Sequence, residues 1–427
     1  MKLNYIILIT GLILASTSYT WAQGQFTLSG EFRPRTEYNH GTKTLIQEGQ
    51  KAGLFISQRS RLNLQYLSDR YQFKLVLQDI RTWGSVPQLN TTDGLTSIHE
   101  AWADIRFNQA FSLKLGRQEI IYDDHRIFGN VDWAQQARSH DAALLKYKSG
   151  DSFQAHFGLA YNQNGMVLVK TPYEVPNSYK AFQYLWLHKD WEQLKASLLF
   201  LNNGNEFEDK IVYSQTIGTD INYKADKWLT HVSFYYQGGK DALDQDLNAY
   251  MANANLTYLI NPAYSIGAGY DLLSGQDQIV SSGEGSIKNK VFTPFYGTNH
   301  KFYGFMDYFY VGSPHGNVGL QDAYINLKHK KDKLALGADI HSFFSQASVA
   351  DLEDASQELD KFMGVEVDLT FGYQIAKDVK LNIGYSQMFG GETLEALKGG
   401  DSSKTNNFAW AMLTLKPTFF TQSKKKD

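Results

Sequence analysis

The chain has 427 residues, with 41 basic and 44 acidic side chains, no cysteine, 26 Phe, 26 Tyr and 8 Trp. A nearly neutral chain whose only block of like charge is a terminal Lys-Lys-Lys is a poor partner for nucleic acid, and a chain without cysteine has no disulfide bonds to stabilise it. The aromatic content favours an all-β protein or one that lies at a membrane interface.

The N-terminus has the parts of a secretory signal. Lys2 precedes an apolar run from Tyr5 to Ala15, and small and polar residues follow as far as Ala22. We predict that residues 1–22 are a signal peptide that is cleaved after Ala22. An uncleaved membrane anchor is the alternative, but the apolar run is short for a helical span, and no later stretch is longer.

After the signal, apolar and polar residues alternate with a period of two. In "FTLSGEFRPR" the residues Phe26, Leu28 and Phe32 share one parity, while polar and charged residues take the other, and "FISQRSRLNLQYL" repeats the pattern. Alternation of this kind indicates strands with one apolar and one polar face. About eighteen such segments occur, each long enough to cross a bilayer when tilted.

The links between these segments alternate in length. Short links fall near residues 68–70, 108–110, 149–151, 189–192, 225–227, 260–262, 328–332 and 374–378, and longer ones near 39–52, 83–96, 123–137, 164–178, 203–210, 239–247, 274–317, 345–359 and 390–406. Short periplasmic turns and long extracellular loops are typical of outer-membrane barrels. We therefore predict an all-β fold, a single antiparallel up-and-down β-barrel of about 18 strands over residues 23–420, with a short basic tail at 421–427. We expect the barrel to lie in the outer membrane of a Gram-negative bacterium, where lipid surrounds it. The barrel-assembly machinery should insert it there.

Enzyme signatures are sparse. The sequence has no G-x-S-x-G elbow, no H-E-x-x-H motif and no phosphate-binding glycine loop. His125 lies beside Asp123 and Asp124, so a metal or acid–base role is conceivable, but no second histidine follows at ligand spacing. The acidic segments 241–246 and 351–360 can hold Ca²⁺ through carboxylates, although solvated acidic loops are the simpler interpretation. We predict no enzyme activity, no cofactor and no metal.

Charged residues inside the predicted strands are more informative. An arginine that faces lipid near the membrane midplane costs about 2–4 kcal/mol, so we expect the strand arginines to point into the lumen and to converge there. Arginines with interspersed carboxylates can bind anionic groups, or the opposite charges can simply pair to stabilise the barrel. Residues two positions apart in a strand share a face, so if Leu113 and Leu115 face lipid, Arg117 would face lipid too. We therefore expect a bulge at Gly116, which would turn Arg117 inward. The residues concerned are Arg33, Arg35, Arg59, Arg61, Arg106, Arg117 and Arg138, with Glu31, Asp79, Glu100, Asp104 and Asp141.

The segments "LGRQEIIYDDHRIFGNVDWAQQARSHDA", "TPFYGTNHKFYGFMDYF" and "GLQDAYINLK" resemble the alginate export family of outer-membrane porins, and the resemblance covers nearly the whole mature chain. It implies a single 18-stranded barrel. In the well-known exporters an Arg-rich constriction selects the polyuronate, and a long loop and a periplasmic turn partly close the pore. The periplasmic turns here are too short to form a plug. By resemblance, the expected channel or loop-scaffold residues are Arg117, Arg126, Arg138, Asp141, His300 and Asp307.

The sequence thus predicts an outer-membrane porin that passes an anionic saccharide such as alginate or its oligomers. A general or differently selective nutrient porin is one alternative, and an outer-membrane enzyme with a site on its rim is another. Within "GRQEIIYDDHRIFGNVDW" (116–133) a strand should end and an outer loop begin, with Asp132 and Trp133 anchoring that loop to the wall. Segment 274–317 should be the longest outer connection, and part of it should pack against or inside the barrel, because so aromatic a loop is poorly suited to solvent.

Overall fold

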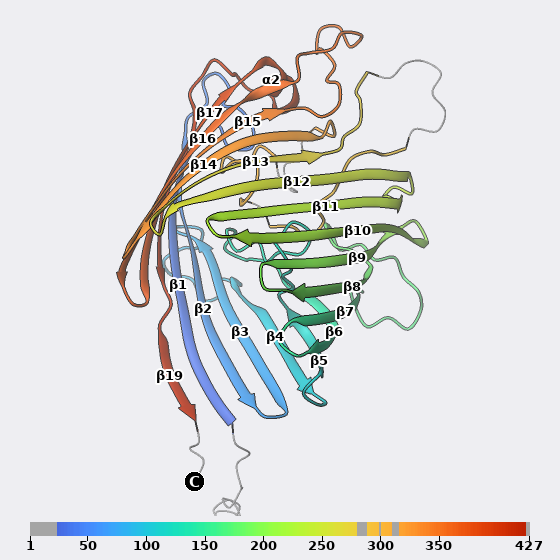
Figure 1. Cartoon of the computed structure of the whole chain (residues 1–427), viewed down its shortest axis with the longest axis vertical. Coiled ribbons are helices and arrows are strands. Elements are labelled where there is room, and N and C mark those ends of the chain that lie inside the picture. Colours follow the sequence, from blue (N-terminus) through green and yellow to red (C-terminus); the bar gives the residue numbers. More distant parts are fainter. Residues whose placement is uncertain (1–23, 280–287, 299, 310–315, 424–427) are drawn as a thin grey trace, which may run out of the picture.

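The computed structural model describes residues 24–279, 288–298, 300–309 and 316–423, which form one closed antiparallel sheet (Figure 1). Each strand pairs with its neighbours in the sequence, as an up-and-down barrel requires. The elements are β1 (Gly24–His40), β2 (Gly53–Ser68), β3 (Tyr71–Thr82), β4 (Thr96–Arg106), β5 (Phe111–Gln118), β6 (His140–Ser149), β7 (Phe153–Tyr161), β8 (Ala181–Asp190), β9 (Leu194–Phe207), β10 (Lys210–Ala225), β11 (Trp228–Lys240), β12 (Asp246–Asn261), β13 (Tyr264–Leu273), β14 (Leu320–Lys331), β15 (Leu334–Phe344), β16 (Phe362–Ala376), β17 (Val379–Gly390), α2 (Glu392–Lys398), β18 (Asn406–Leu415) and β19 (Thr418–Ser423).

The barrel closes where β1 meets the end of the chain. β18 pairs with one half of β1 and β19 with the other half, and Lys416 and Pro417 separate the two strands. Proline has no N–H group to donate and therefore interrupts a ladder, but its carbonyl still accepts the Gly30 N–H at 2.9 Å. β18 and β19 thus continue one another, and the prediction of an all-β barrel of about 18 strands is confirmed. β19 runs on to Ser423, beyond the predicted barrel end at residue 420.

Both ends of the described chain lie at the same rim of the barrel, which we call the terminal end (Figure 1). The links at this end contain two to four residues each. Most links at the opposite rim, the loop end, are long, as the alternation predicted. The predicted loop near 203–210 is an exception, because β9 and β10 continue into a tight turn at Glu208 and Asp209.

The outward face carries an apolar belt around the barrel. Its side chains are exposed in the isolated chain, which is the arrangement of a barrel embedded in lipid. The belt includes Leu62, Phe73, Leu115, Leu145, Leu185, Phe200, Ile217, Val232, Leu256, Ile266, Ile325, Ile340, Leu369 and Ile383. Within the described ranges, no helix has the length and apolar character that crossing a membrane requires.

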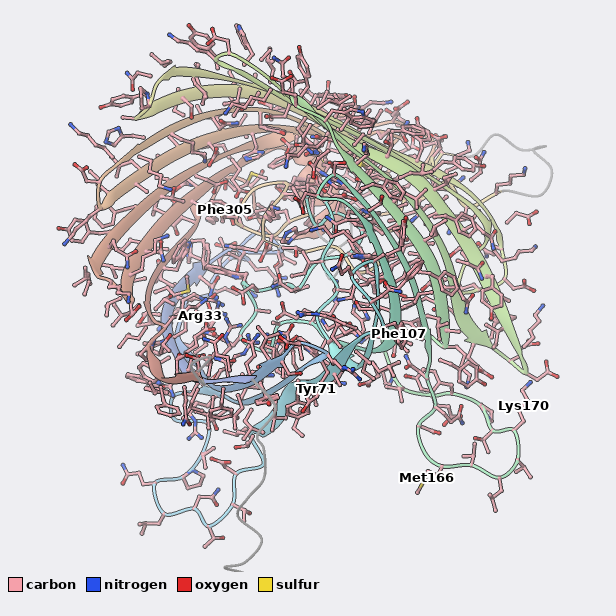
Figure 2. All side chains as sticks on the ribbon, turned by 60° about the horizontal axis from the view of Figure 1, so that its bottom comes forward. Arg33, Tyr71, Phe107, Met166, Lys170 and Phe305 are labelled. Atoms are coloured by element: carbon pink, nitrogen blue, oxygen red, sulfur yellow. The ribbon has the colours of Figure 1, made fainter. Side chains whose placement is uncertain are left out.

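Two segments from the loop end fold into the lumen instead of leaving it open (Figure 2). One is the 119–139 loop between β5 and β6, and the other is the described part of residues 288–309, here called the 288–309 segment. Their apolar side chains, among them Phe128, Tyr296, Met306 and Tyr308, are buried in the main hydrophobic cluster. The expectation that part of segment 274–317 packs inside the barrel is therefore confirmed for its described residues; residues 280–287, 299 and 310–315 lie outside the description.

Candidate functional site

The 119–139 loop crosses the lumen and is anchored on opposite walls. On one side Asp123 accepts a hydrogen bond from Trp186 of β8 at 3.1 Å and another from Ser197 of β9. Arg126 forms ion pairs with Asp124 at 2.7 Å and with Asp271 of β13 at 2.9 Å. Burial and the negative charges nearby raise the pKa of Asp123 to about 6, although its hydrogen bonds act in the opposite direction.

The opposite anchor lies on β1 and β2. Asp132 forms ion pairs with Arg59 at 2.8 Å and Arg33 at 3.2 Å, and Arg59 is fully buried and also binds Glu31 at 2.6 Å. Burial raises the pKa of Asp132, but the two guanidinium groups outweigh it and lower the pKa to about 2. The backbone of the same loop supplies further acceptors, since the Gln135 carbonyl accepts from Arg59 at 3.3 Å.

Trp133 completes this anchor. The Arg35 guanidinium lies 3.7 Å from the centre of its ring, and the His300 ring stacks on it with centroids 3.7 Å apart and an angle of 16°. Cation–π contacts of this kind gain strength when they are shielded from water. The predicted anchoring of the loop by Asp132 and Trp133 is confirmed.

The two inward segments also bind each other. The Gly129 N–H donates to the Tyr296 carbonyl at 2.8 Å, and the Thr298 N–H donates to the His125 carbonyl at 2.9 Å. Arg138 donates to the Gly297 carbonyl at 2.9 Å. These contacts join the segments into one partition across the lumen.

The 288–309 segment has its own anchors on β16. The Met306 N–H donates to Glu366 at 2.8 Å, and the Phe305 N–H donates to Asp368 at 3.3 Å. Near them, His300 and Asp307 lie within one segment, with Nδ1 and Oδ1 3.2 Å apart. Both residues therefore belong to the loop scaffold in this fold, and Asp307 also faces the cavity described next.

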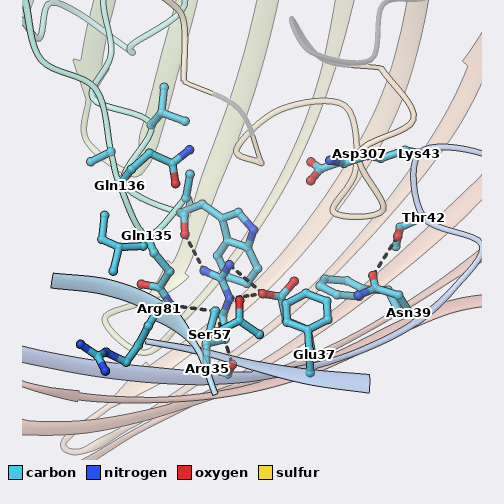
Figure 3. A pocket seen from close by; sticks show the side chains of 18 of the residues that line it. Arg35, Glu37, Asn39, Thr42, Lys43, Ser57, Arg81, Gln135, Gln136 and Asp307 are labelled. Atoms are coloured by element: carbon cyan, nitrogen blue, oxygen red, sulfur yellow. Dashed lines mark hydrogen bonds and ion pairs between the residues drawn. The ribbon is translucent and has the colours of Figure 1, made fainter. Parts of the chain in front are cut away.

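A cavity of about 910 Å³ remains between strands β1–β3 and the 119–139 loop (Figure 3). Thr42 of the β1–β2 link and Ser85 of the β3–β4 link border it, so it faces the loop end. Charged and polar side chains dominate the view: Arg35, Glu37, Asn39, Lys43, Gln135, Gln136 and Asp307.

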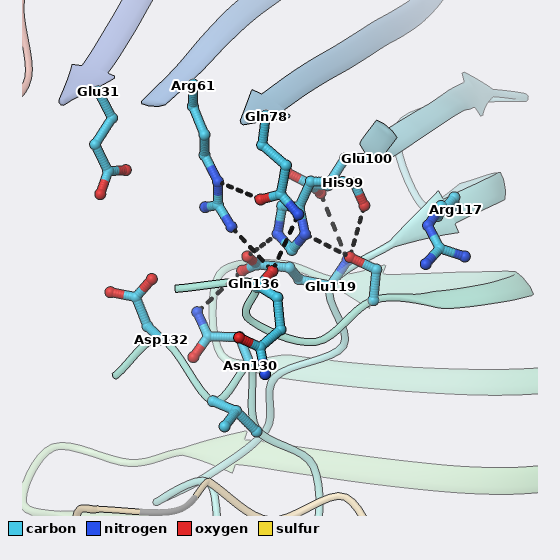
Figure 4. Close-up of polar contacts among 12 residues, drawn as sticks. Glu31, Arg61, Gln78, His99, Glu100, Arg117, Glu119, Asn130, Asp132 and Gln136 are labelled. Atoms are coloured by element: carbon cyan, nitrogen blue, oxygen red, sulfur yellow. Dashed lines mark hydrogen bonds and ion pairs between the residues drawn. The ribbon is translucent and has the colours of Figure 1, made fainter. Parts of the chain in front are cut away.

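Among the predicted arginines, Arg61, Arg106 and Arg138 form no ion pair with a carboxylate within the described residues, and of these Arg61 and Arg138 lie beside the cavity. Arg138 lines the cavity, and within the described ranges its guanidinium group donates only to the Gly297 carbonyl. Burial lowers its pKa to about 10. Arg61 donates to Gln78 at 3.0 Å and to the carbonyl of Gln136, which lines the cavity, at 3.5 Å (Figure 4). A guanidinium group without a carboxylate partner is free to bind an anionic group.

Nearer the terminal end, basic side chains of adjacent strands face the lumen. Lys74 of β3 pairs with Glu100, Lys146 of β6 pairs with Asp104, and Lys114 of β5 lies 4.1 Å from the centre of the Trp102 ring. Glu100 and Asp104 thus lie where the sequence placed them. The three lysines were missed, although they follow the same period of two that identified the arginines.

The predicted position of Arg117 and Asp141 is wrong. The ladders of β5 with β4 and β6 run through Gly116 without a register shift, so the expected bulge is absent there. Arg117 therefore keeps the outward parity of Leu113 and Leu115, and its ion pair with Asp141 at 3.0 Å is exposed. The pair is tolerated because it lies at the loop-end rim, where the cost of an outward charge falls toward zero.

Three further residues differ from the prediction in position. Asp79 lies opposite Ser60 on the outward face and pairs with Arg81, because the β2–β3 register turns Gln78 inward. Arg106 is the last residue of β4 and is exposed at the terminal end. Arg138 lies in the 119–139 loop and not in a strand.

A family model described as alginate export matches residues 25–409 of the chain. The chain belongs to the alginate export family. The match spans nearly all of the barrel, and together with the fold it makes this family member an outer-membrane porin. Among curated proteins, no sequence matches the chain.

Solved structures share the fold of this alginate export family member. OpdO of Pseudomonas aeruginosa is 14% identical with a TM-score of 0.60, and the match covers 92% of this chain and 98% of that one. OccAB1 of Acinetobacter baumannii is 12% identical with a TM-score of 0.63, covering 92% and 97%. The outer membrane protein OpdK of P. aeruginosa is 10% identical with a TM-score of 0.55, covering 92% and 99%.

Proposed function

We propose that this porin lets an anionic saccharide, such as alginate or its oligomers, diffuse through its lumen. The observation that carries the proposal is that Arg61 and Arg138 have no carboxylate partner among the described residues and lie beside the main cavity. A uronate presents a carboxylate to which a guanidinium group can form two parallel hydrogen bonds. A chain that passes through this cavity would meet these two side chains.

The basic residues near the terminal end continue this path. Lys74 and Lys146 are paired with carboxylates, so they attract an anion without holding it tightly. Conduction requires binding that favours entry but permits exit at several sites. A series of weak basic sites after two stronger ones fits that requirement for a flexible polyanion.

The setting follows from the sequence and the fold. Residues 1–22 would direct export, the apolar belt supports contact with outer-membrane lipid, and insertion would need the barrel-assembly machinery of a Gram-negative cell. Passage by diffusion needs neither a covalent step nor a cofactor.

The test is ion selectivity in planar bilayers. We expect the wild-type channel to prefer anions under a salt gradient. The Arg61→Gln/Arg138→Gln variant should lose much of that preference, because the substitutions remove two unpaired positive charges from a narrow passage. Arg117→Gln is the matched control, since that guanidinium lies outside the lumen. An unchanged reversal potential in the double variant would contradict the proposal.

Current block identifies the substrate class. Oligouronates should interrupt the wild-type current at lower concentration than neutral oligosaccharides of equal length, and the double variant should lose this difference. Equal block by both sugars in the wild type would favour a general porin.

A nutrient porin for neutral or cationic solutes is the second candidate, and one observation favours it. A second cavity of about 620 Å³ near the loop end is lined by Glu174, Glu206 and Asp241 and by asparagine and tyrosine side chains, and no cationic side chain lines it among the described residues. If solutes pass on this side of the partition, Asp241→Asn should change selectivity while the Arg61→Gln/Arg138→Gln variant should not.

A further inference from the structure

Two acidic residues and a histidine meet where the 119–139 loop touches the barrel wall at β10 and β11. His231 Nε2 lies 2.6 Å from Asp220 Oδ2 and 3.9 Å from Asp124 Oδ2. One potential ligand atom from each of the three residues lies within 4.8 Å of the other two. The three residues come from separate parts of the chain, so no local sequence motif contains them. The histidine that adjoins Asp124 in the sequence, His125, is not part of the group.

The arrangement is peculiar because both carboxylates approach the same ring nitrogen. A single N–H group can donate to one of them, and it reaches Asp220 while Asp124 stays at 3.9 Å. A cation bound to the nitrogen lone pair would contact both carboxylates at once. At His341, by contrast, each ring nitrogen faces a different carboxylate: Nδ1 lies 2.9 Å from Asp322, and Nε2 lies 3.9 Å from Asp368.

A fourth polar side chain lies on the same face of the wall. Ser233 lies directly across from Asp220 in the β10–β11 ladder and two residues from His231 on the same face. The residue is 1% exposed, and its hydroxyl has no hydrogen-bond partner within the described ranges. A buried hydroxyl without a partner costs free energy, so this one is available to a bound ion or to its water.

The charge balance leaves room for a cation. Asp123 and Asp220 lie near Asp124, and Arg126 forms ion pairs with Asp124 and Asp271. The nearby Lys301 donates to the Asp124 carbonyl at 2.7 Å. Four carboxylates thus face two cationic side chains when the histidine is neutral. Arg126 occupies one lone pair of Asp124 Oδ2 at 2.7 Å, and a carboxylate oxygen has a second lone pair to offer.

We propose that Asp124, Asp220 and His231 bind a divalent transition-metal cation that fastens the 119–139 loop to the barrel wall. The mixed imidazole and carboxylate donors suit Zn²⁺ and its first-row neighbours better than Ca²⁺, which takes only oxygen ligands. Zn²⁺ has no geometric preference of its own and is the appropriate probe. Since Asp124 belongs to the loop and the other two residues belong to the wall, the ion would join the partition to β10 and β11.

The experiment measures metal bound to the refolded, full-length mature barrel in detergent at slightly alkaline pH, because a histidine must lose its proton to bind a metal. After incubation with micromolar Zn²⁺ and desalting, we expect one ion per chain and a rise in thermal stability with metal concentration. His231→Ala should lower the affinity tenfold or more. His341→Ala is the matched control, because it removes a histidine that contacts two carboxylates through opposite nitrogens, and it should bind Zn²⁺ as the wild type does.

Three results would overturn the proposal: no bound Zn²⁺ in the wild type, binding only at millimolar metal, or equal loss in both variants. If His231→Ala fails to fold, as shown by loss of heat-modifiable migration on a gel, X-ray absorption of the Zn²⁺-loaded wild type decides. A shell with one imidazole nitrogen near 2.0–2.1 Å and oxygen neighbours supports the site, and an all-oxygen shell refutes it.

Discussion

Arg59→Met should destabilise the barrel more than any other single loss of an arginine on β1 or β2. Arg59 is 0% exposed, and its guanidinium group holds Glu31 at 2.6 Å and Asp132 at 2.8 Å. Removing one partner of a buried ion pair costs about 3–5 kcal/mol, because a charge is left buried without compensation. Glu31 keeps two weaker neighbours, Arg33 at 3.9 Å and Lys416 at 3.7 Å, so we expect a loss near the lower limit, about 3 kcal/mol.

Urea unfolding of the refolded protein, followed by tryptophan fluorescence, measures this loss. Adding Glu31→Gln to Arg59→Met removes the stranded charge and should restore about 1–2 kcal/mol, which the double-mutant cycle reports as coupling. Arg117→Met is the control, because its ion pair with Asp141 is 43% and 65% exposed and should contribute less than about 1 kcal/mol. A loss in Arg59→Met no larger than in Arg117→Met, or no recovery in the double variant, would refute the reasoning.

Three further predictions concern the inward segments and the strand that precedes one of them. The two bound guanidinium groups outweigh burial and lower the pKa of Asp132 from 3.8 to about 2. The stabilising contribution of this carboxylate is therefore present above pH 4 and is lost as the pH falls to 2. In urea titrations the free energy of unfolding of Asp132→Asn should be lower than that of the wild type by about 1 kcal/mol at neutral pH, as expected for a half-exposed carboxylate, and this difference should vanish between pH 4 and pH 2. Gly116→Val should cost about 1–3 kcal/mol, since φ is 117° and a Cβ would meet the backbone of β4, whereas Gly165→Val at an open site should leave the urea midpoint unchanged. Glu366→Ala leaves the buried Met306 N–H without an acceptor, at a cost of about 1–3 kcal/mol, and should speed proteolysis of the 288–309 segment; unchanged cleavage would show that other contacts hold it.

The barrel could be predicted because the sequence patterns that indicate it are local. The alternation at Phe26, Leu28 and Phe32 and the lengths of the links each depend on neighbouring residues, and lipid outside the barrel requires the pattern to continue around it. The same alternation would have found Lys114, which is flanked by Leu113 and Leu115, if lysine had been considered with arginine.

The interior could be predicted only in part, because its contacts join distant residues. Asp132 and Arg33 are 99 positions apart, and Arg126 and Asp271 are 145 apart, so no sequence window contains both partners. The error at Arg117 has a different cause. The assumption that every strand arginine must face the lumen ignored position along the strand, and a charge at the rim is cheap where a charge at the midplane is not.

The arginines of the lumen divide into two groups with different physical roles. Arg33, Arg35 and Arg59 are buried and paired, so they hold the partition in place and cannot exchange their partners for a passing anion at low cost. Arg61 and Arg138 lack such partners among the described residues and border the space that the partition leaves. We propose that the first group sets the width of the passage and that the second sets its charge preference. On this proposal the two alternatives left open by the sequence apply to different residues: structural pairing applies to the first group, and anion binding applies to Arg61 and Arg138.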